Sequence, residues 1–298
     1  MSKRLTTLVV TLLIVVGLLL TGCSTAKLGT EENPLIWTFV PSQDSEEVLA
    51  GAQQIADAVA DKTGVIIKTN IATEYAGLIE AMCNGEAHMG ALNTFGYVIA
   101  SERDCAKVAL ASVRYGSPFY TGQIVVGVDA GISSLEDLAG KTFCRPDPLS
   151  TSGWIIPSIM MSAVGVDPAT DLGQVVDANG HDGVITAIYN GDCDAGATFV
   201  DARSNVEDDL ADVKDKVLVL EVSPEIPNDT ISFGKDVPDE LRDQVVTALL
   251  EVANDETFAE ILNQTYSWNG LVEKDETFYE PFKQVLDASD IDVSSFLE

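Results

Sequence analysis

The chain has 298 residues, of which 46% are hydrophobic and 21% charged, so it is long enough for two domains of ordinary size and apolar enough to bury a core. Its 47 acidic residues outnumber the 17 basic ones and give a formal net charge of −30. Nucleic-acid binding requires a clustered basic face, which the sequence lacks, so we expect no nucleic-acid partner. The charge indicates solubility or adaptation to a salty exterior.

The first 23 residues have the pattern of an export signal. Two basic residues precede an apolar run from Leu8 to Leu20, which is typical of a secretory signal rather than of a packed element. The Leu-Thr-Gly-Cys that follows resembles the bacterial lipobox, which would make Cys23 the lipidated first residue of the mature protein. The alternative is an uncleaved membrane anchor, because the run approaches the roughly 18 residues of a spanning helix. Both interpretations place the rest of the chain outside the cytoplasmic membrane, at the cell surface or in the periplasm, tethered through residues 24–33.

Short apolar strands then alternate with amphipathic helices, the rhythm of a parallel α/β sheet. A strand at 35–40 precedes a helix that Asp44 and Glu47 begin as a capping box. Thr94 follows a strand and begins another helix, where a hydroxyl is favoured as a cap. The other predicted elements of this first series are strands at 65–70 and 88–92 and a helix at 75–84.

A strongly apolar strand at 123–128 opens a second series of the same kind. A capping box from Ser133 to Glu136 is predicted next. From Asp229 the pattern becomes helical. The other predicted elements are strands at 142–144, 174–178, 193–199 and 216–222 and helices at 183–190, 238–252, 258–265 and 277–288.

The chain passes between the two series twice, near residues 120–123 and 224–229. We therefore expect an α/β clamshell of two lobes joined by two crossing segments. Lobe 1 is predicted to comprise residues 34–121 and 228–298, and lobe 2 residues 122–227. Ligands of open α/β sheets bind beyond the carboxyl ends of the strands, so the cleft between the lobes is the expected site and hinge closure the expected motion.

Three consecutive hydroxyl side chains, Ser150, Thr151 and Ser152, meet the predicted start of a helix that runs to about Val164 and are followed by Gly153. The first turn of a helix has unpaired N–H groups and a partial positive charge, so hydroxyl donors there complete a socket for an oxyanion. A plain N-cap is the alternative. Three hydroxyls exceed what capping requires, and the sequence predicts an anion site of amides and hydroxyls without cationic side chains.

Four cysteines remain after Cys23. An even number in an exported chain predicts two disulfides, and four cysteines permit three pairings. Pairing Cys83 with Cys105 and Cys144 with Cys193 keeps each bridge inside one lobe and is preferred. The sequence has no Cys-x-x-Cys or His-x-x-x-His spacing and no nucleotide-binding glycine motif, so we expect no metal and no cofactor.

The chain resembles the extracytoplasmic solute-binding proteins of phosphate, phosphite and phosphonate ABC importers, a branch of the type II periplasmic binding fold. The resemblance covers about residues 33–290 and rests on five motifs in order. They are Ser-Ser-Leu-Glu-Asp-Leu-Ala-Gly-Lys at 133–141, Asp147-Pro148 leading into residues 150–153, Gly180-His181-Asp182, Gly-Asp-Cys-Asp-Ala-Gly at 191–196, and Ile226-Pro227-Asn228-Asp229. The resemblance implies a membrane-anchored lipoprotein that captures a small phosphorus oxyanion and delivers it to a membrane permease.

The resemblance also implies roles for individual residues. The oxyanion-binding turn is matched by Ser150, Thr151 and Ser152, a histidine that reaches the same oxygens by His181, and aromatic positions on the opposite wall by Tyr75 and Tyr120. Thr94 begins another helix after a strand and could add a donor from the first lobe, but simple capping is the preferred interpretation for it. For His181 the alternative is a core or cap histidine, and for the tyrosines it is packing.

Asp201 and Asp229 bear on the choice of ligand. An ionised carboxylate only accepts hydrogen bonds, so it repels an anion unless the ligand presents a proton. Two aspartates facing the site would select a ligand with a P–OH group or with an ammonium on a short arm. Family members that bind aminoalkylphosphonates can carry Glu where this chain has Asp201. The alternative for both aspartates is solvated surface.

Other functions lack their sequence motifs. Ser150 or Ser152 could form a catalytic triad with His181 and an aspartate, yet no Gly-x-Ser-x-Gly elbow surrounds either serine. We therefore expect a binding protein and no enzyme. The remaining alternatives are a clamshell protein for another small anion, a sulfonate or a carboxylate, and a sensory binding module.

Overall fold

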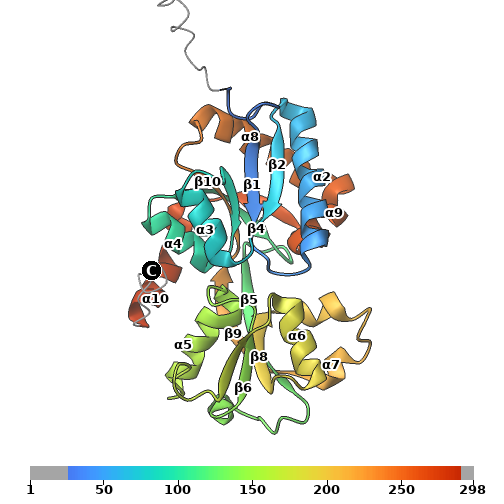
Figure 1. Cartoon of the computed structure of the whole chain (residues 1–298), viewed down its shortest axis with the longest axis vertical. Coiled ribbons are helices and arrows are strands. Elements are labelled where there is room, and N and C mark those ends of the chain that lie inside the picture. Colours follow the sequence, from blue (N-terminus) through green and yellow to red (C-terminus); the bar gives the residue numbers. More distant parts are fainter. Residues whose placement is uncertain (1–25, 290–298) are drawn as a thin grey trace, which may run out of the picture.

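The computed structural model describes residues 26–289 as two α/β lobes stacked along the long axis of the molecule (Figure 1). The predicted export signal, the lipobox cysteine Cys23 and the first part of the tether lie outside the described residues. Within the described part of the chain, no helix combines the length and the hydropathy that crossing a membrane requires.

Lobe 1 is built on a six-stranded sheet with the strand order β11-β4-β10-β3-β1-β2. Its strands are β1 (Leu35–Phe39), β2 (Ile67–Ile71), β3 (Met89–Leu92), β4 (Ala106–Val113), β10 (Thr230–Gly234) and β11 (Gly270–Glu273). The first three run parallel, as the sequence predicts, whereas β10 and β11 run antiparallel to β4. The prediction that the chain becomes helical from Asp229 is wrong for β10. That strand alternates hydroxyl and apolar residues over only five positions, and the sheet buries both faces of it.

Helices pack around the lobe 1 sheet, and α10 (Glu280–Ala288) lies at the side of the lobe (Figure 1). The other helices are α2 (Ser45–Thr63), α3 (Tyr75–Cys83), α4 (Thr94–Glu102), α8 (Asp239–Ala253) and α9 (Ala259–Tyr266). Helix α2 begins as predicted, because the Asp44 carboxylate accepts hydrogen bonds from the N–H groups of Glu46 (3.0 Å) and Glu47 (2.9 Å). Its buried stripe includes Val48 and Ile55 at helical spacing.

Lobe 2 is built on a five-stranded sheet with the order β7-β6-β8-β5-β9. Its elements are β5 (Phe119–Gly127), β6 (Thr142–Arg145), α5 (Ile156–Ala163), β7 (Gln174–Asp177), α6 (His181–Asn190), β8 (Ala195–Phe199), α7 (Val213–Lys216) and β9 (Val217–Pro227). The predicted Ser133–Glu136 capping box is wrong by one residue. Asp137 is the acceptor instead, taking hydrogen bonds from the N–H of Ser133 (2.9 Å) and of Ser134 (3.0 Å) ahead of a 3-10 turn at Leu135–Leu138.

Two neighbouring strands carry the chain between the lobes. β5 and β9 pair antiparallel from Phe119 opposite Pro227 to Gly127 opposite Val217. β5 leads out of lobe 1 and β9 leads back into it, so the two connections lie side by side. The N–H of Asn228 donates to the carbonyl of Pro118 at 2.8 Å and continues the pairing toward lobe 1.

Each lobe contains one disulfide, in the pairing that the sequence favours. Cys83 at the end of α3 is bonded to Cys105 just before β4, and Cys144 in β6 is bonded to Cys193 just before β8. The bonded cysteines are 22 and 49 positions apart in sequence, respectively. Neither disulfide connects one lobe to the other.

The two lobes are closed against each other along one side of the cleft. Leu149, Ile155 and Ile156 of lobe 2 are buried in the same apolar cluster as the core of lobe 1. The start of α5 therefore packs against α4, which brings the predicted anion-binding turn next to the helix N-termini of lobe 1.

Candidate ligand site between the lobes

A small cavity of about 20 Å³ lies between the lobes, and polar and aromatic side chains line it. The residues are Val40, Ser42, Tyr75, Asn93, Arg114, Tyr120, Ser150, Thr151, Ser152, His181, Phe199 and Asp229. The structure thus brings together the predicted site residues from both lobes, with the exception of Asp201 and Thr94. A larger hollow of about 410 Å³ lies on lobe 2 beside Tyr189 and Lys216, far from these residues, and its buried members are apolar.

The hydroxyl turn, residues 150–153, begins the helix at the cavity, but with a widened first turn. Ser150 is the N-cap, and its hydroxyl accepts from the N–H of Gly153 at 3.2 Å. The N–H of Ile155 donates to the carbonyl of Ser150, five residues back, so residues 151–155 form a π turn before α5. The turn needs glycine at 153, because a Cβ there would overlap the Pro146 ring.

The three hydroxyls of this turn have different partners. All are at most 3% exposed. Ser150 caps the helix and keeps its O–H proton, because it acts as an acceptor toward Gly153. Thr151 accepts from Asn93 and Phe95 of lobe 1. The backbone N–H groups of Thr151 and Ser152 lie in the first turn, where the helix offers them no acceptor. Capping accounts for Ser150 in part, and all three residues line the cavity.

His181 begins helix α6 and is 4% exposed. Its backbone N–H donates across the cleft to the carbonyl of Ser42 at 2.9 Å, and its ring packs against Phe199 with centroids 4.7 Å apart. Burial, and then the positive charge of Arg114, lower the pKa of His181 to about 3. The imidazole is therefore neutral at ordinary pH and offers one donor and one acceptor. Its Nδ1 atom is buried and has no partner among the described residues.

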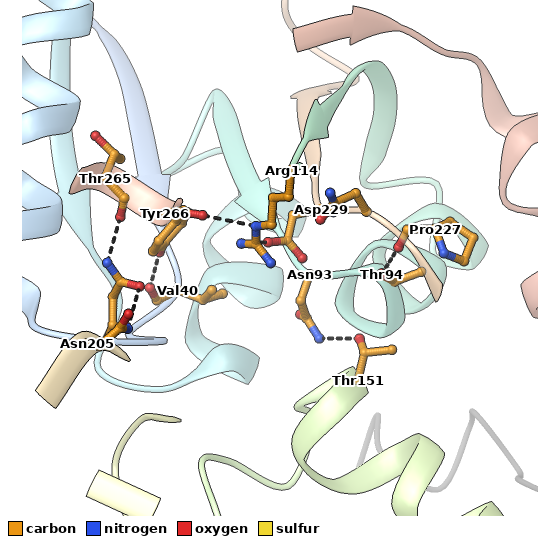
Figure 2. A network of polar contacts seen from close by, with 12 residues as sticks. Val40, Asn93, Thr94, Arg114, Thr151, Asn205, Pro227, Asp229, Thr265 and Tyr266 are labelled. Carbon is orange, nitrogen blue, oxygen red and sulfur yellow. Dashed lines mark hydrogen bonds and ion pairs between the residues drawn. The ribbon is translucent and has the colours of Figure 1, made fainter. Parts of the chain in front are cut away.

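Arg114 is a cavity-lining side chain that the sequence analysis does not predict. It follows β4, is 7% exposed and lines the cavity. Its Nε donates to the carbonyl of Tyr266 at 3.0 Å and its Nη2 to Asp229 Oδ2 at 2.7 Å (Figure 2). The guanidinium carbon lies 5.4 Å from the Tyr120 ring centroid. The cavity lining thus contains a cationic side chain, which the sequence analysis does not predict, and the use of amides and hydroxyls to hold the anion stays a prediction.

Asp229 forms a buried ion pair with Arg114. Burial raises the pKa of Asp229, and the Arg114 charge opposes that rise. The positive charge of Arg114 is largely neutralised by the negative charge of Asp229. A ligand anion therefore meets a neutral ion pair rather than a free cation. The Asp229 carboxylate only accepts hydrogen bonds, so it still repels any ligand oxygen beside it that carries no proton.

Asp201 and Thr94 lie outside the cavity lining. Asp201 is exposed and takes a left-handed conformation (φ 65°) ahead of the 3-10 turn Ala202–Val206, so it fits the solvated-surface alternative. Thr94 is buried as the first residue of α4, and its hydroxyl donates to the carbonyl of Pro227 at 2.6 Å (Figure 2). That bond satisfies its proton within the protein.

Tyr75 and Tyr120 line the cavity, and both are buried. Burial, together with nearby carboxylates, raises the pKa of both phenols, so they stay protonated and remain donors. Tyr75 also begins α3, and its backbone N–H donates across the cleft to Asp147 Oδ2 at 3.2 Å. In the part of the chain that the structure describes, no group of three or more His, Cys, Asp or Glu side chains is placed to hold a metal ion.

Two lobes on paired strands, closed over a buried polar cavity, are the fold of type II periplasmic binding proteins. Residues 37–279 match the family described as ABC transporter, phosphonate, periplasmic substrate-binding protein, and the chain belongs to this family. It is a family of substrate-binding proteins and not of enzymes, so the protein is an extracytoplasmic binding protein of an ABC importer.

Two relatives are similar in sequence. The chain is 28% identical over 232 residues to the phosphate-import protein PhnD of Mycolicibacterium smegmatis. This alignment covers 74% of this chain and 72% of the relative. It is 24% identical over 220 residues to the phosphonates-binding periplasmic protein of Escherichia coli (strain K12). That alignment covers 72% of this chain and 65% of the E. coli protein.

Solved structures of the same fold come from two further organisms. The binding protein component of an ABC phosphonate transporter from Pseudomonas aeruginosa superposes with a TM-score of 0.78 at 21% identity over 86% of each chain. PhnD1 from Prochlorococcus marinus, solved with methylphosphonate, gives a TM-score of 0.77 at 14% identity over 87% of this chain and 98% of that one. At these identities the likeness establishes the fold.

Proposed function

We propose that the protein captures a small phosphorus oxyanion, namely a phosphonate, phosphite or phosphate, and delivers it to the permease of its importer. The observation that carries the proposal is the convergence of the hydroxyl turn of lobe 2 and Arg114 of lobe 1 on one buried cavity. Both relatives described above are named for phosphorus oxyanions, which agrees with this class of ligand.

The cavity offers donors on several sides, as a tetrahedral anion requires. The hydroxyls of Ser150 and Ser152 and the first-turn amides lie on one wall, and Arg114 lies on the other. A hydrogen bond to a charged oxygen contributes about 1.5–3 kcal/mol, so three or four such bonds contribute about 4.5–12 kcal/mol toward binding.

The lining favours a compact ligand. The one carboxylate in the cavity lining, Asp229, is already paired with Arg114. Because Asp201 lies outside the lining, an ammonium on a short arm has no free carboxylate to meet. We therefore propose phosphate, phosphite or methylphosphonate, bound with a proton on the oxygen nearest Asp229, in preference to 2-aminoethylphosphonate.

We further propose that residues 34–121 with 228–298 and residues 122–227 move as two lobes about the β5–β9 connection. The anchor is proposed to be a lipid on Cys23, on the grounds of its Leu-Thr-Gly-Cys context. Replacing Cys23 with Ser should release the protein from membranes, as measured by immunoblotting of membrane and soluble fractions. Retention of the variant in the membrane would instead support an uncleaved anchor.

A thermal-shift screen of the lipid-free chain tests the ligand class. The compounds are phosphate, phosphite, hypophosphite, methylphosphonate and 2-aminoethylphosphonate, with methanesulfonate and acetate as matched anions that carry no phosphorus. A ligand at 100 times its Kd stabilises the native state by about 2.7 kcal/mol. We expect stabilisation by the compact phosphorus oxyanions. Stabilisation by the sulfonate or acetate alone would refute the proposal.

A further inference from the structure

Thr151 connects the two lobes through its side-chain oxygen. Oγ1 accepts a hydrogen bond from Asn93 Nδ2 at 2.8 Å (Figure 2). It accepts another from the backbone N–H of Phe95 at 2.9 Å. Asn93 and Phe95 belong to the start of α4 in lobe 1, whereas Thr151 belongs to the hydroxyl turn of lobe 2. Thr151 is 1% exposed, so water does not compete for these bonds in the closed protein.

The hydrogen-bonding capacity of the Thr151 hydroxyl leaves its O–H proton for the ligand. A threonine oxygen has two lone pairs and one O–H. Lobe 1 occupies both lone pairs, so the proton must point toward a third partner, and Thr151 lines the cavity. We propose that Thr151 couples ligand capture to lobe closure, with its O–H donated to the oxyanion and its oxygen held by lobe 1, and that Asn93 is the positioning residue for it. This inference rests on the proposed function.

The orientation of the Asn93 amide is fixed by its neighbours. Nδ2 also donates to the carbonyl of Leu149 at 2.8 Å. Reversing the amide would place Oδ1 against that carbonyl oxygen and remove both bonds to lobe 2. Oδ1 lies over Gly96, where an added Cβ would be 2.6 Å from it. Asn93 is itself 7% exposed, so its NH₂ group is held toward lobe 2.

Other hydrogen bonds across the cleft lack this property. Tyr75 donates its backbone N–H to the Asp147 carboxylate, and His181 donates its backbone N–H to the carbonyl of Ser42. The acceptors in those bonds are carboxylate and carbonyl oxygens, which carry no proton for a ligand. Of these contacts, only the one at Thr151 has an acceptor that is also a donor.

Ligand and closure then support each other through one oxygen atom. When Thr151 donates to a charged oxygen, its own oxygen becomes a better acceptor for Asn93 and Phe95. Opening the lobes would remove both donors and free the hydroxyl to rotate. The ligand therefore has higher affinity for the closed state, which is the differential affinity that a ligand needs to shift a two-state equilibrium.

A double-mutant cycle tests the coupling, with phosphite and methylphosphonate as probes and Kd measured by calorimetry. Asn93→Ser keeps a good N-cap for α4 and removes the donor. We expect it to weaken binding about 10-fold, because it removes two hydrogen bonds of roughly 0.5–1.5 kcal/mol each. In the Thr151→Val background the same change should cost about 3-fold or less, since only the bond to Leu149 remains. Thr151→Ser should stay within about 3-fold of wild type.

Asn205→Ser is the matched control. Its side-chain amide also crosses the cleft, reaching Gln43 Oε1 at 3.5 Å, but it lies outside the cavity lining. We expect an effect within about 2-fold that is the same in both Thr151 backgrounds. Small-angle scattering at saturating phosphite should show reduced compaction for Asn93→Ser, with the ligand-free unfolding temperature unchanged.

Two outcomes overturn the inference and differ from each other. If Asn93→Ser costs the same factor with and without the Thr151 hydroxyl, Asn93 does not act through Thr151, while the proposed function stands. If wild type binds none of phosphate, phosphite and methylphosphonate in the thermal-shift screen, the proposed function fails and the coupling fails with it.

Discussion

The buried pair of Arg114 and Asp229 yields the sharpest prediction, because it has both a structural role and a proposed binding role. The pair lies at 2.7 Å, with side chains 9% and 14% exposed. Replacing Arg114 with Gln leaves the Asp229 carboxylate buried without its cation. Removing one partner of a buried pair typically costs about 3–5 kcal/mol of unfolding free energy. At about 2 °C per kcal/mol for a chain of this size, we expect the unfolding temperature to fall by about 6–10 °C.

The double variant Arg114→Gln with Asp229→Asn separates the two roles. It replaces the ion pair with two neutral amides of similar shape, so most of the lost stability should return. Binding should not return, because a neutral amide replaces the cationic donor. We expect phosphite affinity to remain about 10- to 100-fold below wild type, from the loss of a charge-assisted hydrogen bond of about 1.5–3 kcal/mol.

Calorimetric titration and thermal unfolding on the same samples measure both effects. A double variant that binds phosphite as tightly as wild type would show that Arg114 only neutralises Asp229, and the proposed contact with the ligand would be refuted. Asp229→Asn alone is the complementary control. It leaves Arg114 uncompensated and should admit methanesulfonate, which has no proton to offer a carboxylate.

The pH dependence of Arg114→Gln follows from the sign of the Asp229 shift. Burial raises the folded-state pKa of Asp229, and removing Arg114 removes the interaction that opposes the rise. A carboxyl with a raised folded pKa binds more protons when folded, so its contribution to stability is largest below the ordinary pKa of about 4 and is lost as the pH rises through the folded value. The stability deficit of the variant should therefore be smaller at about pH 4 than at pH 7.

Further predictions concern single residues. Ser152→Ala should weaken phosphite binding about 10-fold or more in calorimetry, since it removes a cavity donor, and unchanged affinity would remove that hydroxyl from the site. Asp201→Asn should leave affinity within about 2-fold, because the side chain lies outside the cavity, and a large loss would return Asp201 to the site. Replacing Cys83 and Cys105 with Ser should cost about 3 kcal/mol in denaturant unfolding, from the 22-residue separation that the bridge closes, whereas an unchanged midpoint would contradict the loop-entropy estimate. His181 has a folded pKa of about 3 against an unfolded value near 6.5, so stability should decrease as the pH falls from 6.5 toward 3, and His181→Asn should remove that component of the acid sensitivity.

The sequence predicts the local features of this protein well. Capping at Asp44, the parallel strands β1, β2 and β3, and the helix that follows Ser150 all depend on short-range patterns that any chain segment carries by itself. The hydroxyl turn is recognisable for the same reason, because its three polar side chains and the glycine are consecutive.

Arg114 could not be identified in this way. It follows β4, a strand of alanine, serine and lysine as well as valine and leucine that has no clear alternation, and it reaches the cavity only because β10 pairs with β4. A single arginine between Val113 and Tyr115 carries no periodic signal. Its partner Asp229 lies 115 residues away in sequence.

Asp201 is a predicted ligand contact that lies outside the cavity lining. It is exposed and has a positive φ of 65°, and neither its exposure nor its backbone conformation could be predicted from the residues beside it. The hydrogen bond from Asn93 to Thr151 could not be predicted from the sequence either, because it depends on how the two lobes pack against each other.

The side-by-side connections β5 and β9 limit how this molecule can signal that it is loaded. Strands that are hydrogen-bonded to each other cannot slide independently, so the lobes can bend and twist about one shared ladder but cannot shear past each other. In the lobe motion that we propose, an empty and a filled protein would then differ mainly by one angle. A membrane complex that touches the outer tips of both lobes could recognise cargo by the spacing of those tips, without contacting the cargo itself.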